Sequence, residues 1–370
     1  MPLPRMRPIL LALVAAVVLL APDPSGAVVA GRSTSPAAHP WLTSFGACGG
    51  TLVTPRRVLT AAHCIGVLPA DQIRTLRFGG GVRARVARVA LHPGFVTREL
   101  LPETGRPLAG APYDVAILEL DAPVRGVEPL PPARTSPRPG AAVTVLGRGA
   151  TSAGRDEHAG RLRSARLAVI ADRDCVQRHR AQESQDGVAP GYPLSRLLCA
   201  GDPDGRAPFR AACRGDSGSA LVRGGELVGV VSWGDDRCGQ RGAPSAFADV
   251  AAARRFALDE RPDWAPVPSD APAVLGGSAT VGGVVTCTAG RWHRAPDRVV
   301  YRWRISAVDE HGTIRVEDGR PVATTAHTDD GRYAVRAEDA GRRIECEPVG
   351  ISAGGVVNAV GSGPATVPAG

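Results

Sequence analysis

The sequence predicts an all-β protein, and three observations support this class. Short apolar runs recur along the chain, with Gly and Pro turns between them, as in RVLTA, VARVALH, AVTVLG, ELVGVVSW and SAFADV. One segment, AAARRFALDE after Val250, has apolar residues at helical spacing instead. Further strand-like runs follow it, namely VGGVVTCTAG, VVYRWRIS, GRYAVRAEDAG and RRIECEPVG. The β pattern therefore extends through most of the chain.

The length and a change in composition predict more than one domain. At about 150 residues per domain, a chain of 370 residues suggests two or three units. The segment DWAPVPSDAPAV, from Asp263 to Val274, is rich in proline and predicts a semi-rigid linker. We therefore expect one domain over residues 28–262 and a second over residues 275–370.

The first residues have the pattern of a secretory signal. Arg5 and Arg7 precede an apolar run from Ile9 to Ala21, which is too short to span a membrane and is followed by small residues. We expect residues 1–27 to be a signal peptide cleaved after Ser25-Gly26-Ala27, and the alternative is an uncleaved membrane anchor. No later stretch is apolar for long enough to cross a bilayer. The predicted mature protein is secreted, extracellular and not membrane-bound.

The cysteines support this compartment. There are eight, an even number, and none of them forms a C-x-x-C pair. In an exported chain this pattern favours disulfides over metal binding. No acidic cluster with metal-ligand spacing is present, and we expect neither a metal nor a cofactor.

The net charge is +8, and the sequence contains no lysine, so every cationic side chain other than histidine is arginine. An arginine excess can indicate an anionic partner, such as a cell-wall polymer or a nucleic acid. However, Ala, Gly, Pro and Arg are abundant throughout the chain, as in a GC-rich coding sequence. No basic run alternates with aromatic residues, as nucleic-acid binding would require. We therefore expect no nucleic-acid partner.

Three motifs carry the chemistry: TAAHC around His63, DVAIL beginning at Asp114, and GDSG around Ser217. A serine hydroxyl is a poor nucleophile near neutral pH, so it needs a base nearby and a buried carboxylate that orients the base. Each motif has a simpler explanation on its own: a structural histidine, a carboxylate at a strand end, and a tight turn. Their joint occurrence indicates acyl-transfer catalysis.

With the further motifs VVAG at Val28, CGGTLVTPRRVLTAAHC and VSWG, the chain from Val28 to about Arg261 resembles the chymotrypsin/trypsin family of serine proteases. The resemblance implies two antiparallel six-stranded barrels with the active site between them. It implies that Ser217 is the nucleophile, His63 the general base and Asp114 the group that orients His63. The backbone N–H groups of Gly215 and Ser217 would form the oxyanion hole. The expected activity is that of an endopeptidase on protein or peptide substrates.

The resemblance also assigns covalent and ionic pairs. It implies three disulfides and leaves two cysteines to pair downstream, as Cys48–Cys64, Cys175–Cys199, Cys213–Cys238 and Cys287–Cys346. It further implies that a free amine at Val28 pairs with Asp216 and holds the oxyanion loop in its active shape. Because a small-x-small site precedes Val28, we expect export itself to create the active N-terminus.

The expected substrate pocket combines five residues. The resemblance implies that Ala211, six positions before the nucleophile, forms its floor, where an aspartate would select arginine or lysine. Ser232, Trp233 and Gly234 would line the substrate, Ser232 would also support Asp114, and Ser245 would narrow the space. This predicts cleavage after small to medium apolar residues. The alternative is a basic preference, supplied by Asp235 and Asp236.

Two features depart from the family pattern. Ser219 and Ala220 stand where most relatives have a glycine and a proline, so the motif is GDSGSA. The stretch from Thr97 to Pro112 is longer than in compact relatives, and its composition predicts a loop at the rim of the cleft.

The C-terminal residues place Cys287, Trp303 and Cys346 on predicted strands, in the order that resembles an immunoglobulin-like β-sandwich. Ile344 stands where antibody domains have a tyrosine. No motif there can carry out chemistry, so we expect a binding or spacer module with a cell-surface or polymer ligand. Two other functions remain open for the whole chain: an inactive adhesion or carbohydrate-binding protein, and an esterase-like hydrolase.

Overall fold

The computed structural model describes residues 28–67, 70–95, 113–152, 160–186, 197–234, 238–259, 262–268, 271–309, 311, 313–317 and 320–369. The predicted signal peptide, the predicted loop from Thr97 to Pro112, and the pair Asp235 and Asp236 lie outside these ranges. No helix in the described part of the chain has the length and apolar character needed to cross a membrane.

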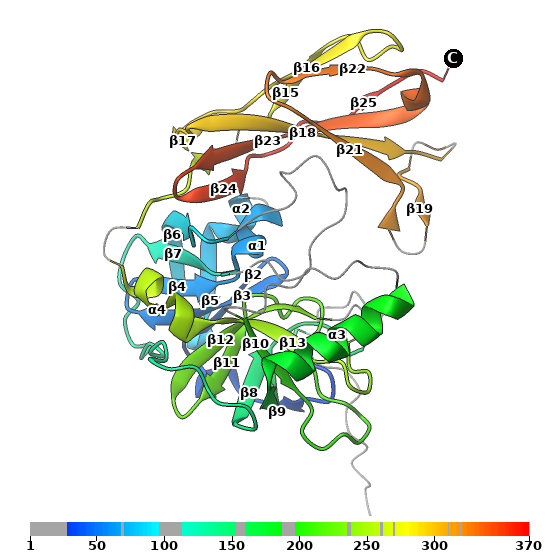
Figure 1. Cartoon of the computed structure of the whole chain (residues 1–370). Helices are drawn as coiled ribbons and strands as arrows, with labels where there is room; N and C mark the ends of the chain where they lie inside the picture. Colours follow the sequence, from blue (N-terminus) through cyan, green and yellow to red (C-terminus); the bar gives the residue numbers. More distant parts are fainter. Residues whose placement is uncertain are drawn as a thin grey trace, which may run out of the picture.

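The first barrel closes in the strand order β2-β3-β4-β7-β6-β5 (Figure 1). Its strands are β2 (Leu42–Phe45), β3 (Cys48–Thr54), β4 (Arg57–Thr60), β5 (Thr75–Phe78), β6 (Arg83–Leu91) and β7 (Ala116–Leu120). In β5, Leu76 and Phe78 are buried while Thr75 and Arg77 are exposed, as expected of a strand with one solvated face. Leu52, Leu59 and Ile117 belong to the buried cluster that fills this barrel.

The second barrel contains six strands that follow one another as β9-β10-β13-β12-β11-β8, and the pairing of β8 with β9 closes it. The short strand β1 (Arg32–Ser33) pairs with the first two residues of β9, Arg163 and Ser164. The six are β8 (Ala142–Gly147), β9 (Arg163–Ile170), β10 (Leu197–Gly201), β11 (Ala220–Arg223), β12 (Glu226–Gly234) and β13 (Ser245–Asp249). Gly224 and Gly225 join β11 to β12 with φ values of 59° and 79°, which a type I′ hairpin turn requires. The prediction of two antiparallel six-stranded barrels is confirmed.

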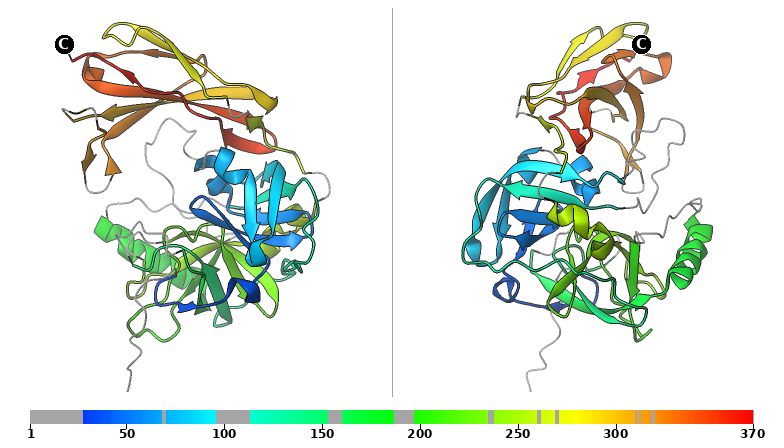
Figure 2. Two further views of the ribbon diagram at one scale, coloured as in Figure 1. Left: turned by 180° about the vertical axis from the view of Figure 1, so that it is seen from behind. Right: turned by 60° about the vertical axis from the view of Figure 1, so that its left-hand side comes forward.

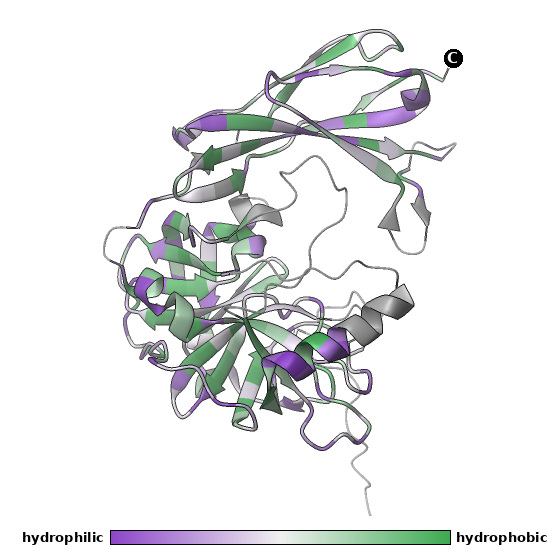
Figure 3. Cartoon of the chain, in the orientation of Figure 1, coloured by the Kyte–Doolittle hydropathy of each residue, from purple (hydrophilic) through white to green (hydrophobic). Residues whose placement is uncertain are grey.

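The α-helices that accompany the barrels in the described ranges are α1 (Ala62–Val67), α2 (Ala70–Ile73), α3 (Asp172–Asp186) and α4 (Val250–Leu258). Helix α4 lies where apolar spacing predicted a helix, and the Asp249 carboxylate caps it by accepting a hydrogen bond of 2.9 Å from the Ala251 amide. Helix α3 was not predicted, because its residues are mostly hydrophilic (Figure 3). Of its first eight residues, only Cys175 and His179 are buried, so no apolar stripe is visible in the sequence. Single-turn 3₁₀ helices in the part of the chain that the structure describes include η1 (Pro36–Ala38), η2 (Gly79–Gly81) and η4 (Ala337–Asp339).

The C-terminal residues form further β-sheets. One sheet has the order β15-β16-β22, from β15 (Val274–Gly277), β16 (Val284–Thr288) and β22 (Arg332–Ala334). The other has the order β21-β18-β23-β24 with β25 beside β23, from β18 (Arg298–Ala307), β21 (Ala323–Thr328), β23 (Arg342–Ser352), β24 (Gly355–Asn358) and β25 (Ala365–Thr366). Two small pairs join β14 (Val267–Pro268) to β17 (Trp292–Arg294) and β19 (Val316–Glu317) to β20 (Arg320–Pro321).

The two larger C-terminal sheets share one core. Trp303 is fully buried in it, and the Cys287–Cys346 disulfide joins β16 of one sheet to β23 of the other. Both views of Figure 2 show the end of the larger sheet that carries β24 lying next to the first barrel. The stretch from Asp263 to Val274 contributes to this contact, since Trp264 and Ala265 are buried in the same cluster as the first barrel. The expected linker thus includes packed residues and the strand β14.

Candidate active site

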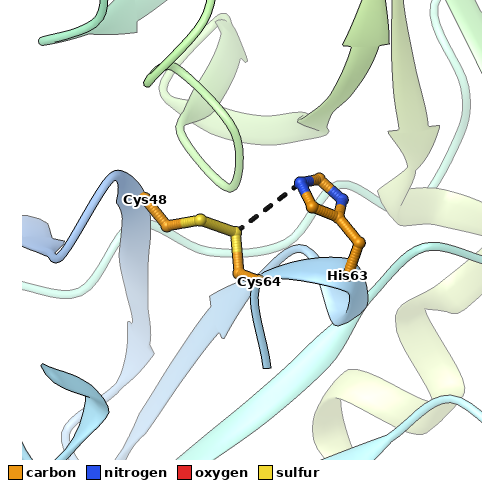
Figure 4. A group of neighbouring side chains, drawn as sticks. All are labelled: Cys48, His63 and Cys64. Carbon is orange, nitrogen blue, oxygen red and sulfur yellow. Dashed lines mark hydrogen bonds between the residues drawn. A yellow bond between two sulfur atoms is a disulfide. The ribbon is translucent and has the colours of Figure 1, made fainter. Parts of the chain in front are cut away.

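His63 lies in the first turn of α1, immediately after β4. The next residue, Cys64, forms a disulfide with Cys48 at the start of β3, and its sulfur lies 3.8 Å from His63 Nε2 (Figure 4). The disulfide therefore fixes the helix that carries His63 to the wall of the first barrel. The imidazole side chain is 32% exposed, so one edge of the ring remains accessible to a substrate.

Asp114 lies just before β7 and is almost completely buried. Its Oδ1 accepts a hydrogen bond of 2.8 Å from the His63 amide, and its Oδ2 lies 2.6 Å from His63 Nδ1. The same Oδ2 accepts a hydrogen bond of 2.6 Å from the Ser232 hydroxyl. Burial alone would raise the pKa of Asp114, but the charge of His63 and these hydrogen bonds hold it below its ordinary value. An ionised carboxylate only accepts hydrogen bonds, so it keeps the proton on Nδ1 and leaves Nε2 as a proton acceptor.

Ser217 comes from the second barrel, on the loop between β10 and β11. Its carbonyl accepts a hydrogen bond of 2.7 Å from the amide of Gly49, the residue after Cys48. The loop contains Gly215 and Gly218 with φ values of 85° and 77°, which side-chain-bearing residues rarely adopt. A Cβ atom at Gly218 would also lie 2.3 Å from the Gly49 carbonyl oxygen. The loop therefore packs directly against the strand that the Cys48–Cys64 disulfide joins to His63.

A cavity of about 220 Å³ opens beside Ser217. It is lined by Ala212, Cys213, Arg214, Ser217, Val231, Ser232, Trp233 and Gly234. Ala211 is buried next to this lining, and its carbonyl accepts a hydrogen bond of 3.0 Å from the Val29 amide. Ser245 is also buried, and its hydroxyl accepts a hydrogen bond of 3.0 Å from the Ala212 amide. Gly234 faces Ser245 across the β12–β13 pair.

Three residues of this lining were not predicted: Ala212, Arg214 and Val231. Arg214 is exposed and contributes to the lining of the cavity from within the nucleophile loop. Its position inside the CRGDSG motif, between Cys213 and Gly215, is the sequence signal that could have identified it.

A second cavity of about 250 Å³ adjoins Gly215 and Ser219, and the half-buried Arg148 lines it. Burial lowers the pKa of the Arg148 guanidinium.

Comparison with known proteins decides the family. A sequence model described as trypsin matches residues 28–257, which is more than half of the chain. The chain belongs to the trypsin family. It is therefore a serine peptidase, a hydrolase that acts on protein substrates.

Individual members of the family agree with this membership. The chain is 32% identical over 240 residues to the trypsin of Saccharopolyspora erythraea, covering 61% of this chain and 94% of that protein. It is 29% identical over 255 residues to trypsin alpha of Drosophila erecta, covering 65% and 89% of the two chains. A solved structure of neuropsin, a serine protease expressed in the limbic system of mouse brain, matches with a TM-score of 0.51 and 26% identity, over 62% of this chain and 97% of that one.

The trypsin-family match begins at Val28, and this residue is fully buried in the cluster that fills the second barrel. Asp216, beside the nucleophile, is also fully buried. Burial raises the pKa of the Asp216 carboxyl to about 7, although amides of Cys213, Gly149 and Arg148 donate hydrogen bonds to it. Among the described residues these amides are its polar partners, and none of them carries a charge.

Two clusters of histidine and cysteine have the proximity of a metal site in the described part of the chain. They are Cys48, His63 and Cys64, and Cys175, His179 and Cys199. In both clusters the two sulfur atoms are joined in a disulfide, so neither offers the thiolate that a metal ion would bind. The other two disulfides are Cys213–Cys238 and Cys287–Cys346, and all four pairs match those expected.

Proposed function

We propose that this protein is a secreted endopeptidase that cleaves after small to medium apolar residues through Ser217, His63 and Asp114. The observation that carries the proposal is the buried Asp114 carboxylate, which binds both the His63 imidazole and the Ser232 hydroxyl at 2.6 Å. In a trypsin-family chain this arrangement makes His63 Nε2 the atom that accepts the proton of the Ser217 hydroxyl.

The reaction then proceeds in two acyl-transfer steps. Ser217 Oγ bonds to the substrate carbonyl carbon while its proton passes to His63 Nε2. His63 returns this proton to the leaving amine as the C–N bond breaks, and water repeats the sequence to release the acyl group. The amides of Gly215 and Ser217 stabilise the negative oxygen of each tetrahedral intermediate, at about 2.7 to 4 kcal/mol per donor.

The preference for small apolar residues rests on the pocket. Ala211 and Ser245 are buried beside it and carry no charge that could pair with a basic substrate side chain. The described residues that line the cavity include no carboxylate that could pair with an incoming arginine or lysine. A basic preference would depend on Asp235 and Asp236, which lie outside the described residues.

Export would also activate the enzyme. Cleavage before Val28 by signal peptidase would give an ammonium group, and a cation near the buried Asp216 would lower its pKa and favour its ionised form. The four disulfides agree with an oxidising, extracellular compartment. N-terminal sequencing of the secreted protein tests this step, and a first residue other than Val28 would contradict it.

The C-terminal sheets are proposed to form an immunoglobulin-like sandwich. Support comes from the disulfide between two sheets and from the buried Trp303 in their shared core. A cell-surface or polymer ligand for this domain remains a proposal.

An active-serine phosphonate tests the catalytic proposal, because it bonds only to an activated serine. We expect the parent protein to be labelled at Ser217 and Ser217→Ala to remain unlabelled. An unlabelled but folded parent would favour the inactive adhesion protein, and labelling with turnover of esters but not of peptides would favour the esterase.

A further inference from the structure

The C-terminal domain contacts the catalytic domain close to the His63–Asp114 pair. The turn between β23 and β24 places the Gly354 carbonyl where it accepts a hydrogen bond of 2.8 Å from the amide of Leu91, the last residue of β6. The next residue, His92, donates its amide to the Val115 carbonyl at 2.9 Å. Val115 directly follows Asp114. One backbone path therefore connects the turn to the residue after the buried carboxylate.

A second contact reaches His63. Strand β24 lies beside α1, the helix that begins with Ala62 and His63 (Figure 1). Val357 of β24 is only 6% exposed and belongs to the same buried cluster as Ala62 and Ile65 of α1. The cluster thus places an apolar side chain of the C-terminal domain with those of the helix that carries His63.

Close packing indicates that this contact is a specific interface between the two domains. A Cβ atom at Gly355 would lie 2.7 Å from the Leu91 Cβ, and the φ of Gly355 is 128°. A Cβ atom at Gly354 would lie 2.1 Å from the carbonyl carbon of Trp264. Side chains at either position would collide with atoms of the interface, so the fit depends on glycine.

The chain between the two domains adds to the same interface. The amide of Ala265 donates a hydrogen bond of 2.7 Å to the Val89 carbonyl of β6. The Arg88 guanidinium lies 4.2 Å from the centroid of a Trp264 ring, within the range of a cation–π interaction. Two successive residues of the connection are therefore attached to the same strand that the Gly354 turn binds.

We propose that the β23–β24 hairpin positions the His63–Asp114 pair, so that the C-terminal domain is required for full catalytic activity. Val357 is a positioning residue that acts through α1, and Gly354 acts through Leu91. This inference rests on the proposed function, because it assumes that His63 and Asp114 serve Ser217. It gives the C-terminal domain a role that needs no external ligand.

The test compares Val357→Asp with Val281→Asp in the full chain. Both variants introduce the same charge into the C-terminal domain, but Val281 is 50% exposed and lies away from the interface on the β15–β16 turn. We expect Val357→Asp to lower kcat by between about tenfold and about a hundredfold, as small displacements of catalytic groups do. The kcat is expressed per serine titrated with phosphonate, so that loss of folded protein alone does not change it. The KM of Val357→Asp should change little. The kcat of Val281→Asp should match that of the parent, and Val357→Ile, which keeps an apolar side chain, should retain most of the parental kcat.

Hydrogen exchange supplies a second readout in the same proteins. Amides of α1 should exchange faster in Val357→Asp than in Val281→Asp, and Val357→Ala serves if the aspartate variant does not fold. Parental kcat per titrated serine together with unchanged exchange in α1 would overturn the inference. A parent that neither binds phosphonate nor cleaves peptides would instead refute the proposed function and, with it, the catalytic role of the hairpin. The exchange comparison would then decide only whether the hairpin positions α1.

Discussion

Asp114 is the residue whose surroundings determine the chemistry of the site. It is 3% exposed, yet its carboxylate accepts hydrogen bonds from the His63 amide, the His63 imidazole and the Ser232 hydroxyl. A buried charge is stable only when such partners replace its lost hydration. The neighbouring Tyr113 stacks on His92 with ring centroids 4.0 Å apart, and burial lowers the pKa of His92 to about 4. A neutral ring therefore supports the backbone next to Asp114 near neutral pH.

These contacts predict graded effects of substitution. Asp114→Asn should lower kcat by about 10⁴-fold, because the amide no longer favours the tautomer in which Nδ1 carries the proton. Ser232→Ala should cost less, between about tenfold and a hundredfold, because it removes one hydrogen bond to a charged group and leaves the others. Steady-state kinetics with a peptide substrate checks both. A loss in Ser232→Ala as large as that in Asp114→Asn would contradict the ranking.

Asp216 predicts a pH dependence of stability in the chain that has not been cut before Val28. Its folded pKa of about 7 exceeds its ordinary value of 3.8, so the folded state retains a proton that the unfolded state releases. The free energy of unfolding should therefore fall as the pH rises from about 4 to about 7. Urea unfolding of uncut Ser217→Ala should show this slope, and the slope should diminish with Asp216→Asn or after cutting before Val28. An equal slope in all three proteins would rule out Asp216 as its source.

At the scale of elements, the loop that carries Ser217 packs closely against strand β3, because a serine on the loop lies against a glycine on the strand. A Cβ atom at Gly49 would lie 2.2 Å from the Ser219 hydroxyl oxygen. Ser219 is one of the two residues that depart from the motif of most relatives, and it is buried against a strand position that has no side chain. The extra serine atoms therefore occupy space that Gly49 leaves open.

This fit predicts a coupled pair of substitutions. Gly49→Ala should lower the free energy of unfolding by roughly 1 to 3 kcal/mol, as overpacking typically does, and should reduce activity by shifting the nucleophile loop. Adding Ser219→Gly should restore much of both, since it removes the clashing hydroxyl. A double-mutant cycle from urea unfolding and kcat/KM measures the coupling. Strictly additive effects would mean that the two residues do not share this space.

The elements also show what the sequence can and cannot predict. Short strands such as Arg57–Thr60 and the catalytic motifs were predictable because their patterns are local. Helix α3 was missed because, among its first eight residues, only Cys175 and His179 are buried and no apolar stripe is present. The role of Gly49 beneath Ser219 depends on segments that meet only in the folded chain. The hydrogen bond between Gly354 and Leu91 joins residues more than 250 positions apart, so no local sequence pattern could predict it.

At the scale of the whole molecule, one buried cluster connects all the parts. It contains Leu52 of the first barrel, Val230 of the second, Trp264 of the connection and Val357 of the C-terminal domain. Domains that share a core should not unfold independently, because exposing one removes packing from the other.

We therefore expect one cooperative unfolding transition. In urea, hydrogen-exchange protection of β18 in the C-terminal domain and of β7 in the first barrel should be lost at the same denaturant concentration. Val357→Asp should separate the two transitions, while Val281→Asp should not. Two separate transitions in the parent would show that the domains are only tethered.

We propose that Ser217 cleaves peptides beside a small pocket whose described lining contains no carboxylate. The most direct measurement is a mass-spectrometric map of the cuts that the mature protein, beginning at Val28, makes in a mixed peptide library, with Ser217→Ala as the control. We expect cuts after alanine, valine and leucine that disappear in Ser217→Ala. Cuts mainly after arginine would contradict the assigned pocket, and the absence of cuts by the folded parent would contradict the catalytic account itself.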